Sequence, residues 1–104
     1  MAFQNTKERY ASFGVATTIA PEIIDSFWRI IDQNLKGVFS LDSILIFHLK
    51  KNKQRKLVID FFDKKTGIGL AVDSPYLYDP FLPHTVYVVD NAGIETILLG
   101  HEVN

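Results

Sequence analysis

The sequence predicts an α+β fold in which one amphipathic helix packs on a mainly antiparallel sheet of about five or six strands. Apolar residues recur at helical spacing in residues 21–36, and the rest of the chain carries short apolar runs broken by turn residues. The connectors between these runs are too short for the crossovers that parallel strands need. At 104 residues the chain has room for one core, so we expect a single domain over residues 1–104.

Composition excludes several functional classes. Hydrophobic residues make up 47% of the chain and the formal net charge is −1, so no global field attracts nucleic acid or anionic membrane. The absence of cysteine excludes disulfides and cysteine-ligated zinc. The start of the chain lacks the apolar segment of a signal peptide, and no stretch approaches the roughly 20 apolar residues of a membrane span. We expect a cytoplasmic, bacterial-type protein with no membrane association and no cofactor.

The segment RYASFGVATTIAPE, residues 9–22, is expected to form the first strand. It alternates small or polar residues with β-favouring ones, which are Tyr10, Phe13, Val15, Thr17 and Ile19. Gly14 marks either a bulge or a close approach of another backbone.

A helix is expected from Pro21 to Lys36. Proline suits the first turn of a helix, and Gly37 stands where a helix commonly ends. The apolar stripe has the spacing i, i+3, i+4, i+7 and consists of Ile24, Phe27, Trp28, Ile31 and Leu35. Trp28 is therefore interpreted as a core residue.

Five strands are expected after the helix, because five apolar runs alternate with turn residues. In the last hairpin, a type I turn over Asp90–Gly93 would pair Val88 with Thr96 and Val86 with Leu98. That register places His84 and His101 on opposite faces, where one metal ion could not bind both. The ending HTVYVVDNAGIETILLGHE is thus interpreted as a hairpin, with no metal site.

His48 and Asp60 are the candidates for acid–base catalysis. Pairing of their two strands would bring the imidazole diagonal to the carboxylate, on the face that also carries Ile46 and Phe62. No serine or other nucleophile stands at a defined spacing from them. The favoured interpretation is a hydrogen-bonded histidine on a half-buried sheet face, so no catalytic residue is assigned.

A basic segment, KKNKQRK at residues 50–56, is expected at a hairpin tip. It carries five positive charges in seven residues, on Lys50, Lys51, Lys53, Arg55 and Lys56. Such a tip can contact phosphates, which makes it the candidate nucleic-acid site. A solvated turn is favoured, because the rest of the chain is slightly acidic.

The segment SPYLYDPFLP, residues 74–83, is expected to be a loop because it holds three prolines. Its aromatic side chains Tyr76, Tyr78 and Phe81 are too apolar to face water without a reason. They either fold back as a lid over the core, which is favoured, or stay exposed as anchors for a partner.

Four segments resemble a family of small uncharacterised proteins first catalogued from staphylococci and related Gram-positive bacteria. They are RYASFGV, PEIIDSFWRIID, DSILIFHL and VYVVDNAGIETILLGHE. The matching positions are Arg9, Tyr10, Gly14, Pro21, Trp28, Asp32, Asp42, Phe47, Leu49, Val89, Asp90, Thr96, Leu98, Leu99 and Glu102. The resemblance covers both ends better than residues 50–83. It implies a compact domain of unknown function and adds nothing on mechanism.

Three functional hypotheses follow. The leading one is a non-enzymatic interaction module that binds a protein partner or a second copy of itself, through the aromatic loop or a sheet edge. The second is weak nucleic-acid binding through residues 50–56. The third is a small enzyme that uses His48 and Asp60, which ranks last because no activated group stands at a defined spacing.

Overall fold

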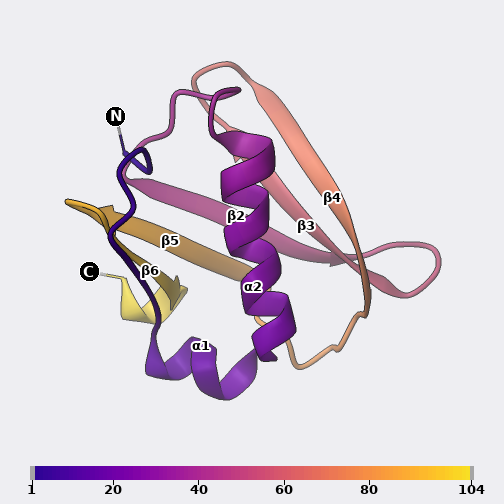
Figure 1. The fold of residues 1–104 in the computed structure, drawn as a ribbon. Helices are drawn as coiled ribbons and strands as arrows, with labels where there is room; N and C mark the ends of the chain where they lie inside the picture. The colour runs from indigo at the N-terminus through magenta and orange to yellow at the C-terminus, as the bar shows by residue number, and fades with distance from the viewer. Residues whose placement is uncertain (1, 104) are drawn as a thin grey trace.

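The computed structural model describes residues 2–103 as one sheet with helices on one of its faces (Figure 1). The strands are β1 (Glu8–Ala11), β2 (Ile44–Lys51), β3 (Lys56–Asp63), β4 (Ile68–Leu77), β5 (Thr85–Asn91) and β6 (Ile94–Leu99). The helices are α1 (Phe13–Thr18) and α2 (Pro21–Ile30), with a π-helical turn at Ile31–Leu35 and a 3₁₀ turn at Gly100–Glu102.

The strand order across the sheet is β1-β6-β5-β2-β3-β4. Four neighbouring pairs are antiparallel, but β1 and β6 are parallel, with Tyr10 opposite Thr96. The α+β class is confirmed, and the sheet is mixed, although mostly antiparallel. β1 and β6 come from opposite ends of the chain, so no hairpin turn fixes their relative direction.

The prediction of a strand over residues 9–22 is wrong beyond Ala11. Residues 13–18 form α1, which begins after Ser12, whose hydroxyl accepts a hydrogen bond from the N–H of Val15. Ser12 is a good N-cap, and it ends the strand by satisfying a free donor of the first turn. Gly14 lies in α1 and marks neither a bulge nor a close backbone, because the atoms that a Cβ there would meet belong to side chains, with Cδ1 of Leu99 at 2.8 Å.

The predicted helix is confirmed over Pro21–Leu35, as α2 followed by the π-helical turn. Lys36 donates its N–H to the carbonyl of Ile31, five residues back, and Gly37 follows with φ of +81°. Only glycine adopts that φ at no steric cost, so the helix ends there.

The core lies between α2 and one face of the sheet. Leu45, Phe47 and Leu49 alternate along β2 and are buried on this face. The ring of Phe47 meets that of Phe27 of α2 edge to face, with the ring centres 5.3 Å apart. The opposite face of the sheet, which carries no helix in Figure 1, is called the open face.

The predicted register of the last hairpin is wrong by one residue. Val88 pairs with Ile97, and Val86 pairs with Leu99. The turn residues are Ala92 and Gly93, with φ of +52° and +93°, a tight two-residue turn in place of the longer one expected. The basis for placing His84 and His101 on opposite faces is therefore removed, and His101 lies outside β6 in the 3₁₀ turn.

The predicted loop at residues 74–83 is wrong in its first part, because β4 continues through Leu77. Pro75 is tolerated there because β4 is an edge strand, and the pairing with β3 is irregular between Lys56 and Val58. The loop begins at Tyr78.

Candidate functional site

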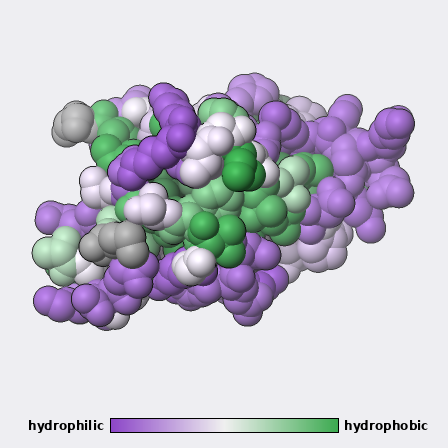
Figure 2. Space-filling view, turned by 90° about the horizontal axis from the view of Figure 1, so that it is seen from above, coloured by the Kyte–Doolittle hydropathy of each residue, from purple (hydrophilic) through white to green (hydrophobic). Residues whose placement is uncertain are grey.

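The open face carries more apolar surface than a solvated sheet face needs. Ile44 of β2 is 46% exposed, Phe62 of β3 51%, and Ile94 of β6 42%. Figure 2, which looks from above Figure 1 and not directly onto the open face, also shows hydrophobic side chains across the middle of the molecule. Exposed apolar patches of this kind mark binding surfaces.

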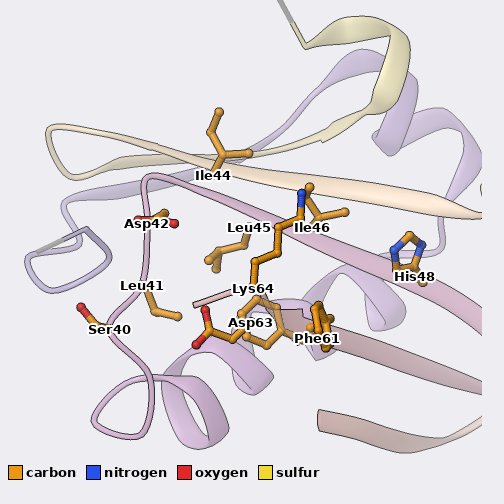
Figure 3. Close-up of a pocket in the computed structure, with 11 residues that line it drawn as sticks. Ser40, Leu41, Asp42, Ile44, Leu45, Ile46, His48, Phe61, Asp63 and Lys64 are labelled. Atoms are coloured by element: carbon orange, nitrogen blue, oxygen red, sulfur yellow. The ribbon is translucent and has the colours of Figure 1, made fainter. Parts of the chain in front are cut away.

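A pocket of about 360 Å³ lies where β2 and β3 diverge (Figure 3). β2 pairs with β5 from Ile44 onward, whereas its pairing with β3 starts only at Phe47, opposite Phe61. The first three residues of β2 therefore have a paired strand on one side only. The pocket is lined by Ser40, Leu41, Asp42, Ile44, Leu45, Ile46, His48, Phe61, Phe62, Asp63 and Lys64.

The walls of the pocket are apolar and its rim is charged. Leu45 and Phe61 are buried and form the inner wall, and Ile44 and Phe62 belong to the exposed open face. Lys64 extends toward Ile46 in Figure 3. The pocket can therefore take an apolar group and place a positive charge beside it.

Two contacts hold the rim in shape. Lys65 forms a 2.8 Å ion pair with Asp42, which ties the β3–β4 turn to the segment before β2. The hydrogen bond with the Asp42 carboxylate raises the pKa of Lys65. Asp63 is buried and accepts a hydrogen bond of 2.8 Å from the Thr66 hydroxyl. Both acids near the pocket are thus engaged within the protein.

His48 and Asp60 lie directly opposite each other on β2 and β3, and not diagonally as predicted. The Asp60 carboxylate forms an ion pair with the ammonium group of Lys50 at 2.8 Å. Nδ1 of His48 is 3.4 Å from the Thr85 hydroxyl, which is long for a hydrogen bond. The Asp60 carboxylate is therefore paired with Lys50. It does not orient the imidazole of His48, as the acid of a catalytic dyad would.

The five basic residues of the candidate nucleic-acid site are exposed around the β2–β3 turn. This turn lies at the right-hand end of the molecule in Figure 1, where Figure 2 is hydrophilic. Oδ1 of Asn52 stabilises the turn by accepting hydrogen bonds from the backbone N–H groups of Gln54 and Lys56, each at 2.9 Å. Lys50 is also bound to Asp60, which leaves four of the five without an ion pair within residues 2–103.

The three aromatic residues of the candidate partner site do not form one surface. Tyr76 belongs to β4, and Tyr76 and Tyr78 are half-buried against the core. The N–H of Tyr78 donates to the carbonyl of Arg55 at 2.9 Å. Phe81 stands apart, because it is 92% exposed.

A buried ionic cluster was not predicted from the sequence. Glu95 of β6 is fully buried and accepts hydrogen bonds from the Thr6 hydroxyl and from Nε of Arg9. Arg9 also binds Asp32, and its guanidinium lies 4.9 Å from the ring centre of Trp28. Glu95 and Ile97 are two residues apart in β6, so their side chains lie on the same face of the sheet. Knowledge of the observed register, which buries Ile97, would therefore have indicated that Glu95 is buried.

Two further observations concern metal-ligating side chains and membrane-spanning helices. Among residues 2–103, no group of three or more histidine, aspartate or glutamate side chains is placed to hold a metal ion. Within the same part of the chain, no helix is both long and apolar enough to cross a bilayer.

The fold and the pocket define a small α+β protein with one mixed sheet and a pocket where β2 and β3 diverge. The chain belongs to the family described as staphylococcal protein of unknown function (DUF960), whose model matches residues 8–102. This confirms the family resemblance, and the match runs through residues 50–83 as well.

A crystal structure of a protein of unknown function from Enterococcus faecalis is similar to this chain. The two sequences are 38% identical and the TM-score is 0.89, with 94% of this chain and 92% of that chain covered. No curated protein matches the sequence.

Proposed function

We propose that this protein is a non-enzymatic interaction module whose β2–β3 pocket receives an apolar side chain of a partner protein. The observation that carries the proposal is the half-open apolar pocket on a sheet face that also exposes Ile44 and Phe62. Partners are commonly held by a few large side chains that fill such pockets.

The size and the apolar lining of the pocket suit one large apolar side chain. Its volume of about 360 Å³ lies near the lower limit for small-molecule sites. One aromatic or branched aliphatic side chain would fit the apolar part between Leu45 and Phe61.

The charge at the rim favours an acidic neighbour in the partner. Lys64 has no ion-pair partner within residues 2–103, while Asp42 and Asp63 are engaged by Lys65 and Thr66. An acidic residue next to the inserted side chain would therefore meet a free ammonium group. Catalysis by His48 is not proposed, because Lys50 occupies the Asp60 carboxylate.

Amide NMR shifts can test the pocket with probes that imitate one side chain. Titration with N-acetyl-phenylalanine amide should shift residues 44–46 and 61–64, and an added aspartate in the probe should strengthen binding. Phe62→Ser should abolish the shifts. Ile94→Ser is the matched control, because Ile94 is exposed on the same face outside the pocket.

A photo-crosslinking amino acid can then test for a protein partner. Placed at residue 62 it should capture a partner that the same group at residue 94 does not capture. Equal capture at both positions, or probe shifts that persist in Phe62→Ser, would contradict the proposal.

A further inference from the structure

Strand β4 offers unused hydrogen-bonding groups along the edge of the sheet. It is ten residues long and ends the strand order. The carbonyl of Ser43 accepts from Asp90, and Leu49 donates to His84, so odd residues of β2 direct their backbone groups at β5. Along an antiparallel strand, the backbone N–H and C=O groups of successive residues point alternately toward one neighbouring strand and toward the other.

The same alternation can be followed to the edge. Even residues of β2 face β3, and they lie opposite even residues of β3, such as Asp60 opposite His48. Odd residues of β3 therefore face β4, where Ile59 lies opposite Val72 and Phe61 opposite Leu70. The N–H and C=O groups of the remaining residues, Gly69, Ala71 and Asp73, point away from the sheet, and all three are exposed.

The helix-covered side of this edge is incompletely filled. A groove of about 230 Å³ runs between α2 and β4, with Arg29 and Ile30 on one side and Val72 and Pro75 on the other. Leu70 and Val72 are only half-buried, whereas the central strands bury their core residues. Residues 68–73 contain no proline and pair regularly with β3, so nothing blunts this part of the edge.

We propose that β4 pairs antiparallel with β4 of a second copy of this chain, about a twofold axis at Ala71. Ala71 then lies opposite its own counterpart, and Gly69 lies opposite Asp73. Leu70 meets Val72 on the helix-covered side, which extends both cores across the junction. The same patch serves both subunits, as a closed dimer requires.

The distribution of charge favours the second copy and the antiparallel direction. β4 follows the basic residues Lys64 and Lys65 and carries the acidic Asp73 toward its other end. Asp73 has no ion-pair partner in the part of the chain that the structure describes. Antiparallel pairing places Asp73 of each copy opposite the uncharged Gly69 of the other, whereas parallel pairing would place Asp73 directly opposite Asp73, where like charges repel.

Sedimentation can test the twofold axis through a charge exchange. The wild type should sediment at twice 11.8 kDa at high concentration. Ala71→Lys and Ala71→Asp should each weaken dimerisation at least about tenfold, because like charges meet at the axis. Their mixture should restore the dimer. Ala71 lies opposite Asp60 on β3, so a charge at residue 71 also changes the contacts within one subunit. A melting curve of each variant is therefore needed to show that it is folded.

A disulfide provides a second test, because the natural chain has no cysteine. Ala71→Cys should form an intermolecular disulfide under mild oxidation, since facing residues of such a pair are about 5.5 Å apart at Cα. Phe81→Cys, on an exposed loop, is the control and should crosslink far less. A wild type that stays monomeric at about 1 mM overturns the proposal. A dimer that survives in Ala71→Lys but is lost in Phe62→Ser also overturns it, because the open face would then be the interface.

Discussion

Nε of Arg9 donates to the fully buried carboxylate of Glu95 at 2.9 Å. The same guanidinium binds Asp32 in the π-helical turn, so one side chain joins β1, β6 and the end of the long helix. A buried carboxylate is tolerated only when it is paired and hydrogen-bonded. Arg9 therefore provides the charge that allows Glu95 to be buried.

Arg9→Met should lower the free energy of unfolding by about 3 to 5 kcal/mol, because Glu95 would lose its buried partner. Urea denaturation measures the change. Lys65→Met removes an exposed ion pair with Asp42 and should leave the unfolding midpoint nearly unchanged. Similar midpoints for Arg9→Met and the wild type would show that Glu95 does not depend on Arg9.

Protonation of Asp32 should lower the stability of the folded protein at acidic pH. The hydrogen bond from Arg9 lowers the pKa of Asp32 from 3.8 to about 2. A carboxyl group whose pKa is lower in the folded state stabilises the protein above its unfolded pKa, and this contribution is lost as the pH falls toward the folded value. Asp32→Asn should show a smaller decline in melting temperature between pH 4 and pH 2 than the wild type. An identical decline in both would contradict this origin.

Phe27 and Trp28 should differ in their contribution to stability although they are neighbours on α2. Phe27 is fully buried against Phe47, so Phe27→Ala should cost about 3 to 5 kcal/mol. Trp28 is only partly buried, and one side of its ring faces the Arg9 guanidinium. Trp28→Ala should therefore cost less in thermal or urea unfolding. A larger loss for Trp28 would mean that its ring bridges more of the core than its burial indicates.

Gly93→Ala should destabilise the protein more than Gly67→Ala does. Both glycines have positive φ, of +93° and +73°, so both changes add backbone strain. A Cβ at Gly93 would also lie 2.7 Å from the carbonyl oxygen of Asn5, whereas Gly67 has open space around it. Thermal melts of the two variants would separate strain from steric clash, and equal losses would show that the segment around Asn5 moves aside.

The aromatic residues after Ser74 should separate into two groups. Phe81→Ser should leave the melting curve unchanged, because the side chain is 92% exposed. Tyr78→Ser removes a side chain packed against the core and should cost about 1.5 to 3 kcal/mol at most. If Phe81→Ser also lowers stability, the loop folds back over the core in solution.

Local signals in the sequence were enough to define α2 and most of the later strands. Pro21, the apolar stripe through Phe27 and the glycine at residue 37 all act within a few turns of helix, and each kept its predicted role. The strands from residue 44 onward follow from the alternation of apolar residues and from turn residues between them. These features depend on neighbours in the chain, so they can be found by inspection of the sequence.

The tertiary structure decided what depends on distant residues. Ser12 starts a helix in place of a longer strand, and its hydroxyl donates to Glu102, a residue close to the other end of the chain. The parallel pairing of β1 with β6 buries Glu95 beside Arg9, and the divergence of β2 from β3 opens the pocket. Pairing between distant segments is chosen by the packing of the whole core, and a one-residue change of register turns every side chain to the other face. For this reason α2 and most of the later strands followed from the sequence, but α1, the parallel pairing of β1 with β6 and the candidate site did not.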